Sequence, residues 1–261
     1  MPVKRDLWKE PLSEKYTPNW HCPACSGGYL RVEAQTLRSV ETRESRAAHD
    51  HDAWDPDWIE SRFTGLLKCN NEACQDPVMV AGRGRFEMVQ TGPTDADYVE
   101  FFYPEYVSPS PPLIQIPNDC PAEVIPELKR AFVASWGDFP AAVNRIRAAV
   151  ERLLDFLKEP KTRINKKGHR ERLSLHERIV SLGTRDKDLS DSLLAVKWLG
   201  NVGSHTDSVS RDDVFDALDI LELVLDELFV KHRERVKKLV TAINKKKGPA
   251  KVTKAKSKKK K

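Results

Sequence analysis

Two pairs of cysteines constrain the N-terminal part of the chain more than any other feature. The pairs are His21-Cys22-Pro-Ala-Cys25 and Cys69-Asn-Asn-Glu-Ala-Cys74, more than forty residues apart. Zinc prefers four tetrahedral ligands, and a short turn between two cysteines brings both thiolates to one side of an ion. We therefore predict that Cys22, Cys25, Cys69 and Cys74 hold one zinc ion. The alternative is two unrelated pairs of buried cysteines.

The start of the chain and its hydropathy bear on the compartment. Residues 1–10 lack the apolar run of a secretory signal, and no stretch approaches the roughly 20 apolar residues of a membrane span. We expect a cytoplasmic chain with no membrane partner. Thiols are kept reduced in the cytosol, which favours metal ligands over disulfides. Because protein side chains would fill all four ligand positions, the predicted zinc site is structural rather than catalytic.

The formal net charge of +5 is unevenly distributed. Ten lysines and no acidic residue lie between Lys245 and Lys261, which leaves 34 of the 44 basic residues against all 39 acidic residues in the body. The body is therefore net acidic, which excludes a uniformly basic nucleic-acid binder. The tail is expected to be disordered. It either binds the phosphates of RNA or DNA in a salt-dependent manner or only keeps the chain soluble.

Composition divides the chain into four segments of an α+β protein. We predict a small β-rich, zinc-ribbon-like domain over residues 1–103, a Pro-rich linker over 104–117, an all-α bundle over 118–244 and the tail over 245–261. The β-leaning runs of the first segment are Gly28 to Gln35, Arg62 to Lys68, Val78 to Val89 and Tyr98 to Tyr103. The four prolines of the linker predict an extended connector.

Apolar residues at spacings of three and four predict five helices after Pro117. Their expected ranges are Pro121 to Trp136, Ala141 to Lys158, Leu173 to Leu182, Lys187 to Leu199, and Ser210 to beyond Val240. The last helix begins at Ser210-Arg-Asp-Asp213, a sequence typical of a capping box. Its acidic residues come early and its basic residues late, which matches the helix dipole.

A polar stretch, Lys197-Trp-Leu-Gly-Asn-Val-Gly-Ser-His205-Thr, is predicted to be a turn between two helices. Asn201 and His205 lie in it, and Arg147 and Glu151 share one face of an earlier helix because they are four residues apart. One interpretation is structural: Asn201 caps a helix end, His205 bonds locally, and Arg147 pairs with Glu151. The other is a site for acid–base chemistry on a phosphate.

Four motifs in order resemble a known family. They are Ile116-Pro-Asn-Asp-Cys-Pro121, Arg147-Ala-Ala-Val-Glu151-Arg-Leu-Leu, Leu173-Ser-Leu-His-Glu-Arg-Ile and Gly200-Asn-Val-Gly-Ser-His205. Together they are similar to domain of unknown function 4145, over about residues 98 to 232, and the cysteine pairs are similar to the treble-clef or ribbon-like zinc element that often precedes it. The resemblance implies a HEPN-like helical bundle, a fold found in restriction, toxin–antitoxin and phage-defence systems.

The resemblance also implies two possible functions. Active HEPN ribonucleases carry an Arg-Asn-x-x-x-His motif; Asn201 and His205 match it, whereas Gly200 stands at the arginine position, with Lys197 one turn upstream. The missing arginine favours a non-catalytic or weakly catalytic accessory protein that binds nucleic acid or a protein partner. The alternative is a metal-independent endoribonuclease using His205, Asn201 and either Lys197 or Arg147. The resemblance further implies a homodimer, because HEPN ribonucleases commonly build their site across two bundles.

Overall fold

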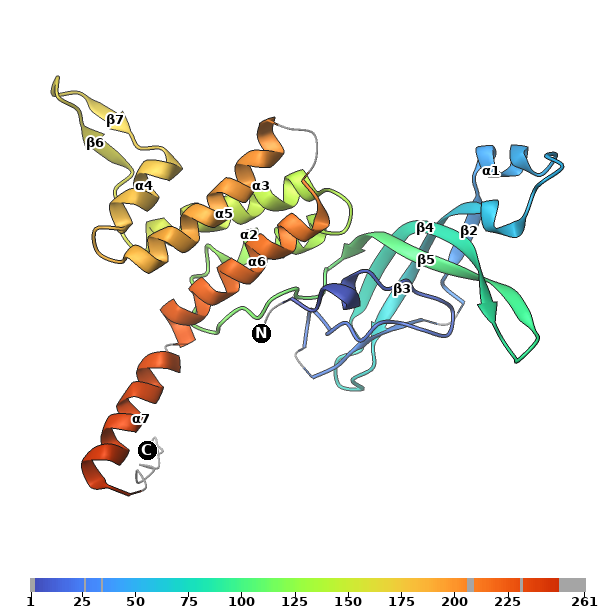
Figure 1. Cartoon of the computed structure of the whole chain (residues 1–261), viewed down its shortest axis with the longest axis horizontal. Helices are drawn as coiled ribbons and strands as arrows, with labels where there is room; N and C mark the ends of the chain where they lie inside the picture. Colours follow the sequence, from blue (N-terminus) through green and yellow to red (C-terminus); the bar gives the residue numbers. More distant parts are fainter. Residues whose placement is uncertain (1–2, 26, 34, 206–208, 231, 249–261) are drawn as a thin grey trace.

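The computed structural model describes residues 3–25, 27–33, 35–205, 209–230 and 232–248, with the backbone alone for residues 201–205 and 232–235. The strands are β1 (Leu30–Val32), β2 (Arg38–Glu41), β3 (Glu60–Cys69), β4 (Pro77–Gln90), β5 (Ala96–Ser108), β6 (Thr162–Ile164) and β7 (Arg170–Arg172). The helices are η1 (Arg5–Trp8), α1 (Arg43–Ala48), η2 (Pro56–Trp58), α2 (Ile125–Ala134), α3 (Phe139–Phe156), α4 (Leu175–Leu182), α5 (Lys187–His205), α6 (Arg211–Leu225), η3 (Asp226–Val230) and α7 (His232–Lys246). The chain is thus an α+β protein, with a β-rich half followed by a helical half (Figure 1).

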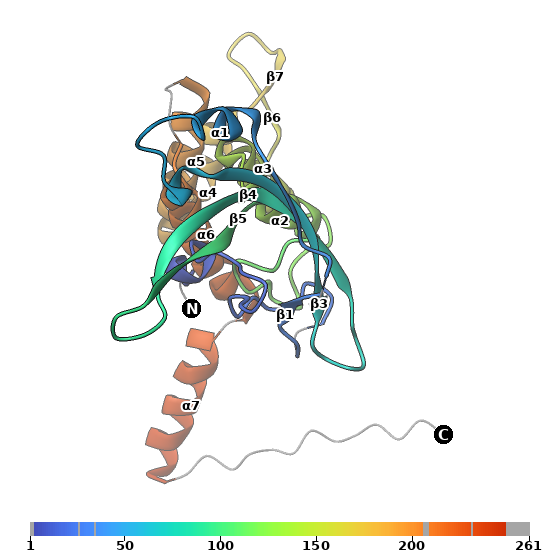
Figure 2. The ribbon, with the colours of Figure 1, turned by 90° about the vertical axis from the view of Figure 1, so that its right-hand side faces the viewer.

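The β-rich half is an antiparallel sheet in which β3, β4 and β5 pair in chain order, and β1 and β2 pair with the two ends of β3. The sheet is strongly curved (Figure 2). Its buried side chains alternate along β3, with Phe63, Leu67 and Cys69 inward, as a half-buried strand requires. The four predicted β-leaning runs all contain strands, whereas β2 and the β6–β7 hairpin were not predicted.

The stretch predicted as a Pro-rich linker is part of the fold. Strand β5 continues to Ser108, so residues 104–108 pair with β4. The β4–β5 register shifts between Ala81 and Gly82, opposite Pro104 to Tyr106. Proline has no backbone N–H, and such an irregularity in the ladder is one of the places where a strand tolerates it. Beyond the strand, Leu113 and Ile114 are buried. The predicted connector is therefore wrong over residues 104–108, which belong to β5, whereas residues 109–117 form no helix or strand.

The helical half packs α3 against α2, α5 and α6, with α4 against α5. Ser210 and Asp213 form the predicted capping box at the start of α6. The predicted last helix is not one uniform α-helix, because the five residues of η3 form a π-helical turn after Leu225. Helix α7 runs to Lys246, so the first tail lysines are helical; the rest of the tail, from residue 249, lies outside the described residues.

The predicted polar turn is helical. Helix α5 runs from Lys187 to His205 and contains both glycines of that stretch. Glycine is a poor helix former, but at Gly200 the absence of a side chain permits a close contact with another helix. A Cβ there would lie 2.6 Å from Cδ and 2.8 Å from Cγ of Arg147 on α3. Packing between α3 and α5 thus outweighs the low propensity of this glycine.

Candidate functional site

The four predicted cysteine ligands come together between the start of β1 and the β3–β4 turn. Their Sγ atoms all lie within 4.8 Å of one another. The Cys22–Cys74 and Cys25–Cys69 sulfur separations are 3.8 and 3.6 Å. A tetrahedral ion with sulfur ligands at about 2.3 Å requires sulfur separations of about 3.8 Å. The donor set and its spacing therefore fit a metal ion, and the alternative of two unrelated cysteine pairs is wrong.

The surrounding backbone is shaped around the sulfurs. The N–H of Ala24 donates to Cys22 Sγ at 3.4 Å, and the N–H of Asn71 donates to Cys69 Sγ at 3.4 Å. Gly28 is buried beside the cluster, and a Cβ there would lie 2.3 Å from Cys69 Sγ. The sequence therefore places glycine where any side chain would displace a ligand.

The thiol pKa values differ across the cluster. A backbone hydrogen bond from Gly27 lowers the pKa of the Cys25 thiol to about 7. Burial raises the pKa of the Cys22 and Cys69 thiols. A metal ion offsets that burial cost, because it takes the thiolate as its ligand. The fifth cysteine, Cys120, is buried far along the sequence from the cluster, and burial raises the pKa of its thiol.

The predicted polar site is only partly described. Asn201 and His205 lie on the last turns of α5, and their side chains are outside the described residues. Lys197, on the same helix, is buried, and its Nζ lies 3.4 Å from the centroid of the Trp198 ring. Burial lowers the pKa of this ammonium, and the charge of Arg147 lowers it further. Lys197 is thus held in the α3–α5 packing rather than in open solvent.

Arg147 and Glu151 lie on consecutive turns of α3, and both are half-buried. The Arg147 side chain passes directly over Gly200, at the short distances from a hypothetical Cβ given above. Because a Cβ at position 200 would overlap it, the Arg147 aliphatic chain occupies the space where a side chain at Gly200 would begin. The structure therefore brings Arg147 and Lys197 together beside the last turns of α5, which begin near Gly200.

Three tryptophans join the two halves of the chain. Trp136, which follows α2, makes edge-to-face contacts with Trp8 and Trp20 at centroid distances of 5.6 and 4.9 Å. Its Nε1 donates to Ser110 Oγ at 2.9 Å. Arg211 of α6 donates to the carbonyls of Trp8 and Trp136, both at 3.1 Å. The buried residues of both halves consequently form one continuous hydrophobic core.

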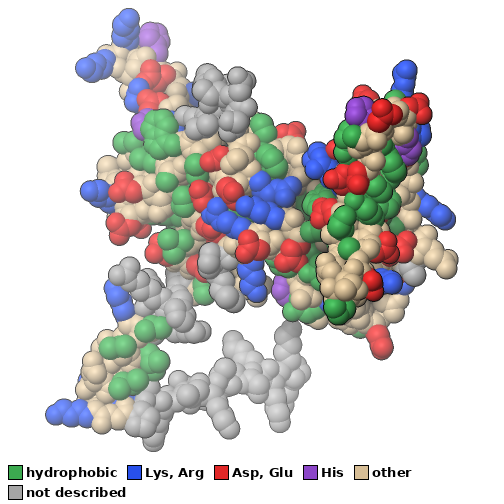
Figure 3. Space-filling view, turned by 45° about the vertical axis from the view of Figure 1, so that its right-hand side comes forward, with side chains coloured by type: hydrophobic (Ala, Val, Ile, Leu, Met, Phe, Trp, Pro, Cys, Tyr) green, Lys and Arg blue, Asp and Glu red, His purple; other side chains and the backbone are tan. Residues whose placement is uncertain are grey.

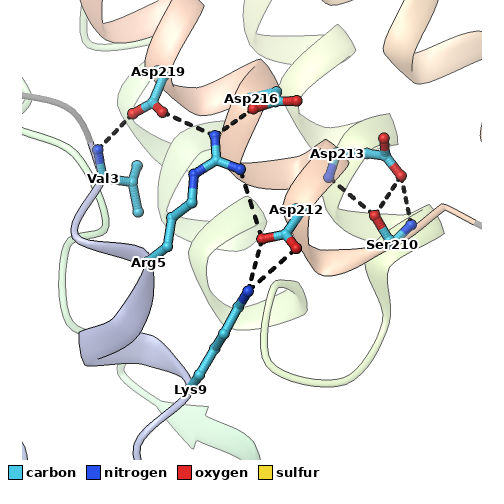
Figure 4. Close-up of polar contacts among 8 residues, drawn as sticks. All are labelled: Val3, Arg5, Lys9, Ser210, Asp212, Asp213, Asp216 and Asp219. Carbon is cyan, nitrogen blue, oxygen red and sulfur yellow. Dashed lines mark hydrogen bonds and ion pairs between the residues drawn. The ribbon is translucent and has the colours of Figure 1, made fainter.

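Ion pairs reinforce the same junction on its outer side. Arg5 bonds with Asp216 and Asp219 of α6, and Lys9 reaches Asp212 at 3.0 Å (Figure 4). The N–H of Val3 donates to Asp219 Oδ1. Such exposed pairs add little stability each, but they fix how the N-terminal segment lies along α6.

A cleft of about 1180 Å³ lies between the sheet and the helices. Its walls come from β4, β5, the segment after β5, α2 and the start of α3. Seven basic side chains line it: Lys9, Arg83, Arg85, Lys129, Arg130, Arg145 and Arg211. Four acidic side chains line it: Glu10, Asp76, Glu105 and Asp138. Figure 3 shows Lys and Arg side chains gathered on the helical half where it faces the sheet. The side chains that line the cleft thus include more basic than acidic groups, on a body that is net acidic.

Arg211 is the most enclosed of these cations. It makes the two backbone hydrogen bonds described above and lies 5.5 Å from the Phe139 ring centroid. Burial lowers the pKa of its guanidinium. Within the described part of the chain it forms no ion pair with a carboxylate, whereas Arg83, Arg130 and Arg145 each do. Its charge is thus one in the cleft that an external anion would neutralise.

Sequence reasoning did not find this cleft. Its basic residues are scattered from position 9 to position 211, so no charge run marks them. The net acidic charge of the body gives no indication of a local excess of basic residues.

Comparison with known families divides the chain at the same place as the fold. Neither a curated protein nor a solved structure matches it. None of the described helices has the length and apolar character needed to span a membrane. Residues 10–107 match the family described as Domain of unknown function (DUF8608), and residues 129–254 match the family described as Domain of unknown function (DUF4145), as the motifs of the helical half indicated.

Proposed function

We propose that this protein is a non-catalytic nucleic-acid-binding accessory protein, and that the cleft between its halves holds the sugar–phosphate backbone. The observation that carries the proposal is the excess of basic side chains in the cleft lining, seven against four acidic ones, on an otherwise acidic body. Phosphate contacts supply most of nonspecific nucleic-acid affinity, and a concave positive wall focuses that attraction. A role within a defence or restriction system follows from the HEPN resemblance.

The cleft also favours a single strand over a duplex. Tyr103 and Tyr106 of β5 line it, and Tyr106 is exposed. A positive groove with aromatic rings is how proteins hold single strands, because every base has a face that stacks. The lysine tail has no aromatic residue, so it adds affinity for phosphate without a stacking surface.

The metal in this proposal is one structural zinc ion in a ribbon-like element. Four thiolates at tetrahedral spacing are the donor set of closed zinc sites. Pro23 and Ala24, which lie between the first two ligands, also line the cleft. Zinc would therefore hold one wall of the cleft in place, in addition to stabilising the β-rich half.

The test measures binding of a fluorescent single-stranded RNA by anisotropy. A chain ending at Gly248 removes the tail lysines beyond the described residues. In it, Lys129→Glu, Arg130→Glu and Arg145→Glu together reverse three charges on the helical wall of the cleft. Affinity should fall at least about tenfold, and the slope of log affinity against log salt should become shallower by about 2, since each phosphate contact contributes about 0.7.

The matched control reverses three charges on the β6–β7 hairpin, at Lys166, Lys167 and Arg170. All three are exposed and lie outside the cleft. Affinity should change by less than about threefold, because those charges are beyond the screening length from the bound strand. A larger loss in the hairpin variant than in the cleft variant would contradict the proposed site.

A second function is favoured by one specific contact. The Arg147 chain fills the space at Gly200, the position where HEPN ribonucleases carry their arginine. In this alternative Arg147 supplies the guanidinium from α3, and Asn201 and His205 act from α5 as an endoribonuclease. Cleavage of RNA by the wild type that is lost in His205→Ala would favour it. Binding without cleavage, unchanged in His205→Ala, favours the accessory function.

A further inference from the structure

One face of the curved sheet (Figure 2) continues beyond the cleft. Residues directly opposite each other on neighbouring antiparallel strands point to the same face. Tyr103 of β5 lines the cleft and is opposite Arg83 of β4. Arg83 is in turn opposite Arg62 of β3, and Arg62 is opposite Val40 of β2. A row of side chains therefore leads out of the cleft across four strands to the edge of the sheet.

A second row runs beside the first. Tyr106, the other tyrosine of the cleft, is opposite Ala81 of β4. Ala81 is opposite Thr64 of β3, and Thr64 is opposite Arg38 of β2. Three steps of about 4.8 Å between neighbouring strands make each row about 14 Å long. We call the surface formed by these two rows the outer sheet face.

The outer sheet face is open to solvent away from the cleft. Arg38, Arg62 and Thr64 are exposed, and Val40 is 66% exposed. Phe63, which lies between two of these residues on β3, is buried in the core. The sheet thus has one face in the core and one face in water, as antiparallel sheets commonly do.

The two arginines farthest from the cleft keep their full charge. Arg83 pairs with Glu105 at 2.5 Å, so its charge is partly neutralised. Arg38 and Arg62, within the described part of the chain, form no ion pair with a carboxylate. Arg62 Nη1 donates to the Ser61 carbonyl at 3.4 Å, a long hydrogen bond that leaves its charge uncompensated. An exposed guanidinium of this kind matches a phosphate group in both geometry and charge.

Apolar side chains lie beside these arginines. Leu66 and Met79 are opposite each other in the next row along β3 and β4, and they are 37% and 56% exposed. Bases turned toward the sheet would contact this apolar surface and the planes of the guanidinium groups. An apolar partner would instead bury Arg38 and Arg62 without a counter-charge, which is costly. The mixture of groups therefore fits a single nucleic-acid strand better than an apolar protein surface.

We propose that a bound single strand leaves the cleft at Tyr103 and Tyr106 and continues over the outer sheet face to β2, where Arg62 and Arg38 bind its phosphates. This inference rests on the proposed function, because the strand enters the face from the cleft. Its consequence is a dependence on length. A short strand fills the cleft alone, whereas a longer strand also covers the sheet.

The test compares single-stranded RNAs of about 4 and about 12 nucleotides, lengths within the usual range of sheet-based sites. Their binding to the full-length protein is measured by anisotropy. Arg38→Gln with Arg62→Gln should weaken the longer RNA at least about fivefold and make its salt slope shallower by about 1.4, since each phosphate contact contributes about 0.7. The shorter RNA should change by less than about twofold, because at moderate salt it lies about one screening length from the lost charges.

Two controls separate phosphate contact from other effects. Lys166→Gln with Lys167→Gln, on the β6–β7 hairpin, removes the same charge and should change the binding of either RNA by less than about twofold. Arg38→Lys with Arg62→Lys keeps the charge and should retain most of the affinity for the longer RNA. If the double glutamine variant loses the circular dichroism spectrum of the wild type, Arg62→Gln alone should give about half the change in slope, about 0.7.

The outcomes distinguish this inference from the proposed function. Equal losses for the two RNAs, or no loss for either, would overturn the path over the sheet even where reversing Lys129, Arg130 and Arg145 still weakens binding. If that reversal leaves both RNAs unaffected, the proposed function fails and this inference fails with it. A longer RNA with a photoreactive uridine at one end or the other gives a second readout. One end should cross-link to residues 38–40 or 62–66 and the other to the cleft; cross-links from both ends in the cleft alone contradict the proposed path.

Discussion

Replacing Trp136 with alanine should destabilise both halves of the protein together. Trp136 is 4% exposed, lies edge-to-face against Trp8 and Trp20, and donates its indole N–H to Ser110. Removing a buried tryptophan costs about 3–5 kcal/mol, and each lost aromatic contact accounts for about 0.5–1.5 kcal/mol. We expect a loss of about 4 kcal/mol in the free energy of unfolding, which is a large share of the stability of an ordinary domain.

The assay is urea unfolding followed by circular dichroism and by tryptophan fluorescence. With a slope of about 3 kcal/mol per molar urea, the midpoint should fall by about 1–1.5 M. Trp198→Ala is the matched control, because Trp198 is 53% exposed on α5; its loss should stay below about 1 kcal/mol. The two probes should report one transition in the wild type. Two separate transitions, or a Trp136→Ala loss no larger than that of the control, would refute the idea of a shared core.

Three other predictions follow from particular contacts. Cys22→Ser should lose a metal content of about one zinc per chain, measured by plasma emission, whereas Cys120→Ser should keep it. Gly82→Ala should lower the free energy of unfolding by about 2 kcal/mol or more, because its Cβ would lie 2.2 Å from the Tyr103 carbonyl oxygen. The control Gly92→Ala, whose Cβ would have no contact under 3.3 Å, should be nearly neutral in thermal unfolding. Hydrogen bonds from the Ser210 hydroxyl and backbone lower the pKa of Asp213. That stabilisation is complete above about pH 4 and is lost as pH falls through the lower folded value. Ser210→Ala should cost about 1 kcal/mol at pH 7 and flatten the acid side of the stability profile in urea titrations.

Local signals in the sequence predicted the local parts of the fold. The paired spacing of Cys22, Cys25, Cys69 and Cys74 identified the cysteine cluster, because each short turn already places two thiols together. The helix stripes and the Ser210 capping box were readable for the same reason: they depend on neighbours within one or two turns.

Features that depend on distant residues were missed. Gly200 is tolerated in a helix because Arg147, on another helix, packs over it. Pro104 is tolerated in a strand because the β4–β5 register shifts at the neighbouring Glu105. The basic cleft is assembled from residues of both halves, so it exists only after the tryptophan junction has formed. No local pattern in the sequence indicates that these residues lie close together in the fold.

The central claim is that the cleft, rather than the lysine tail, holds the nucleic-acid strand. Photo-cross-linking of full-length protein to single-stranded RNA, with the attached peptides identified by mass spectrometry, tests it most directly. The account predicts cross-links at Tyr103 and Tyr106 and on the α2 wall of the cleft, which persist at moderate salt. Cross-links confined to residues 249–261, or to the β6–β7 hairpin, would contradict it.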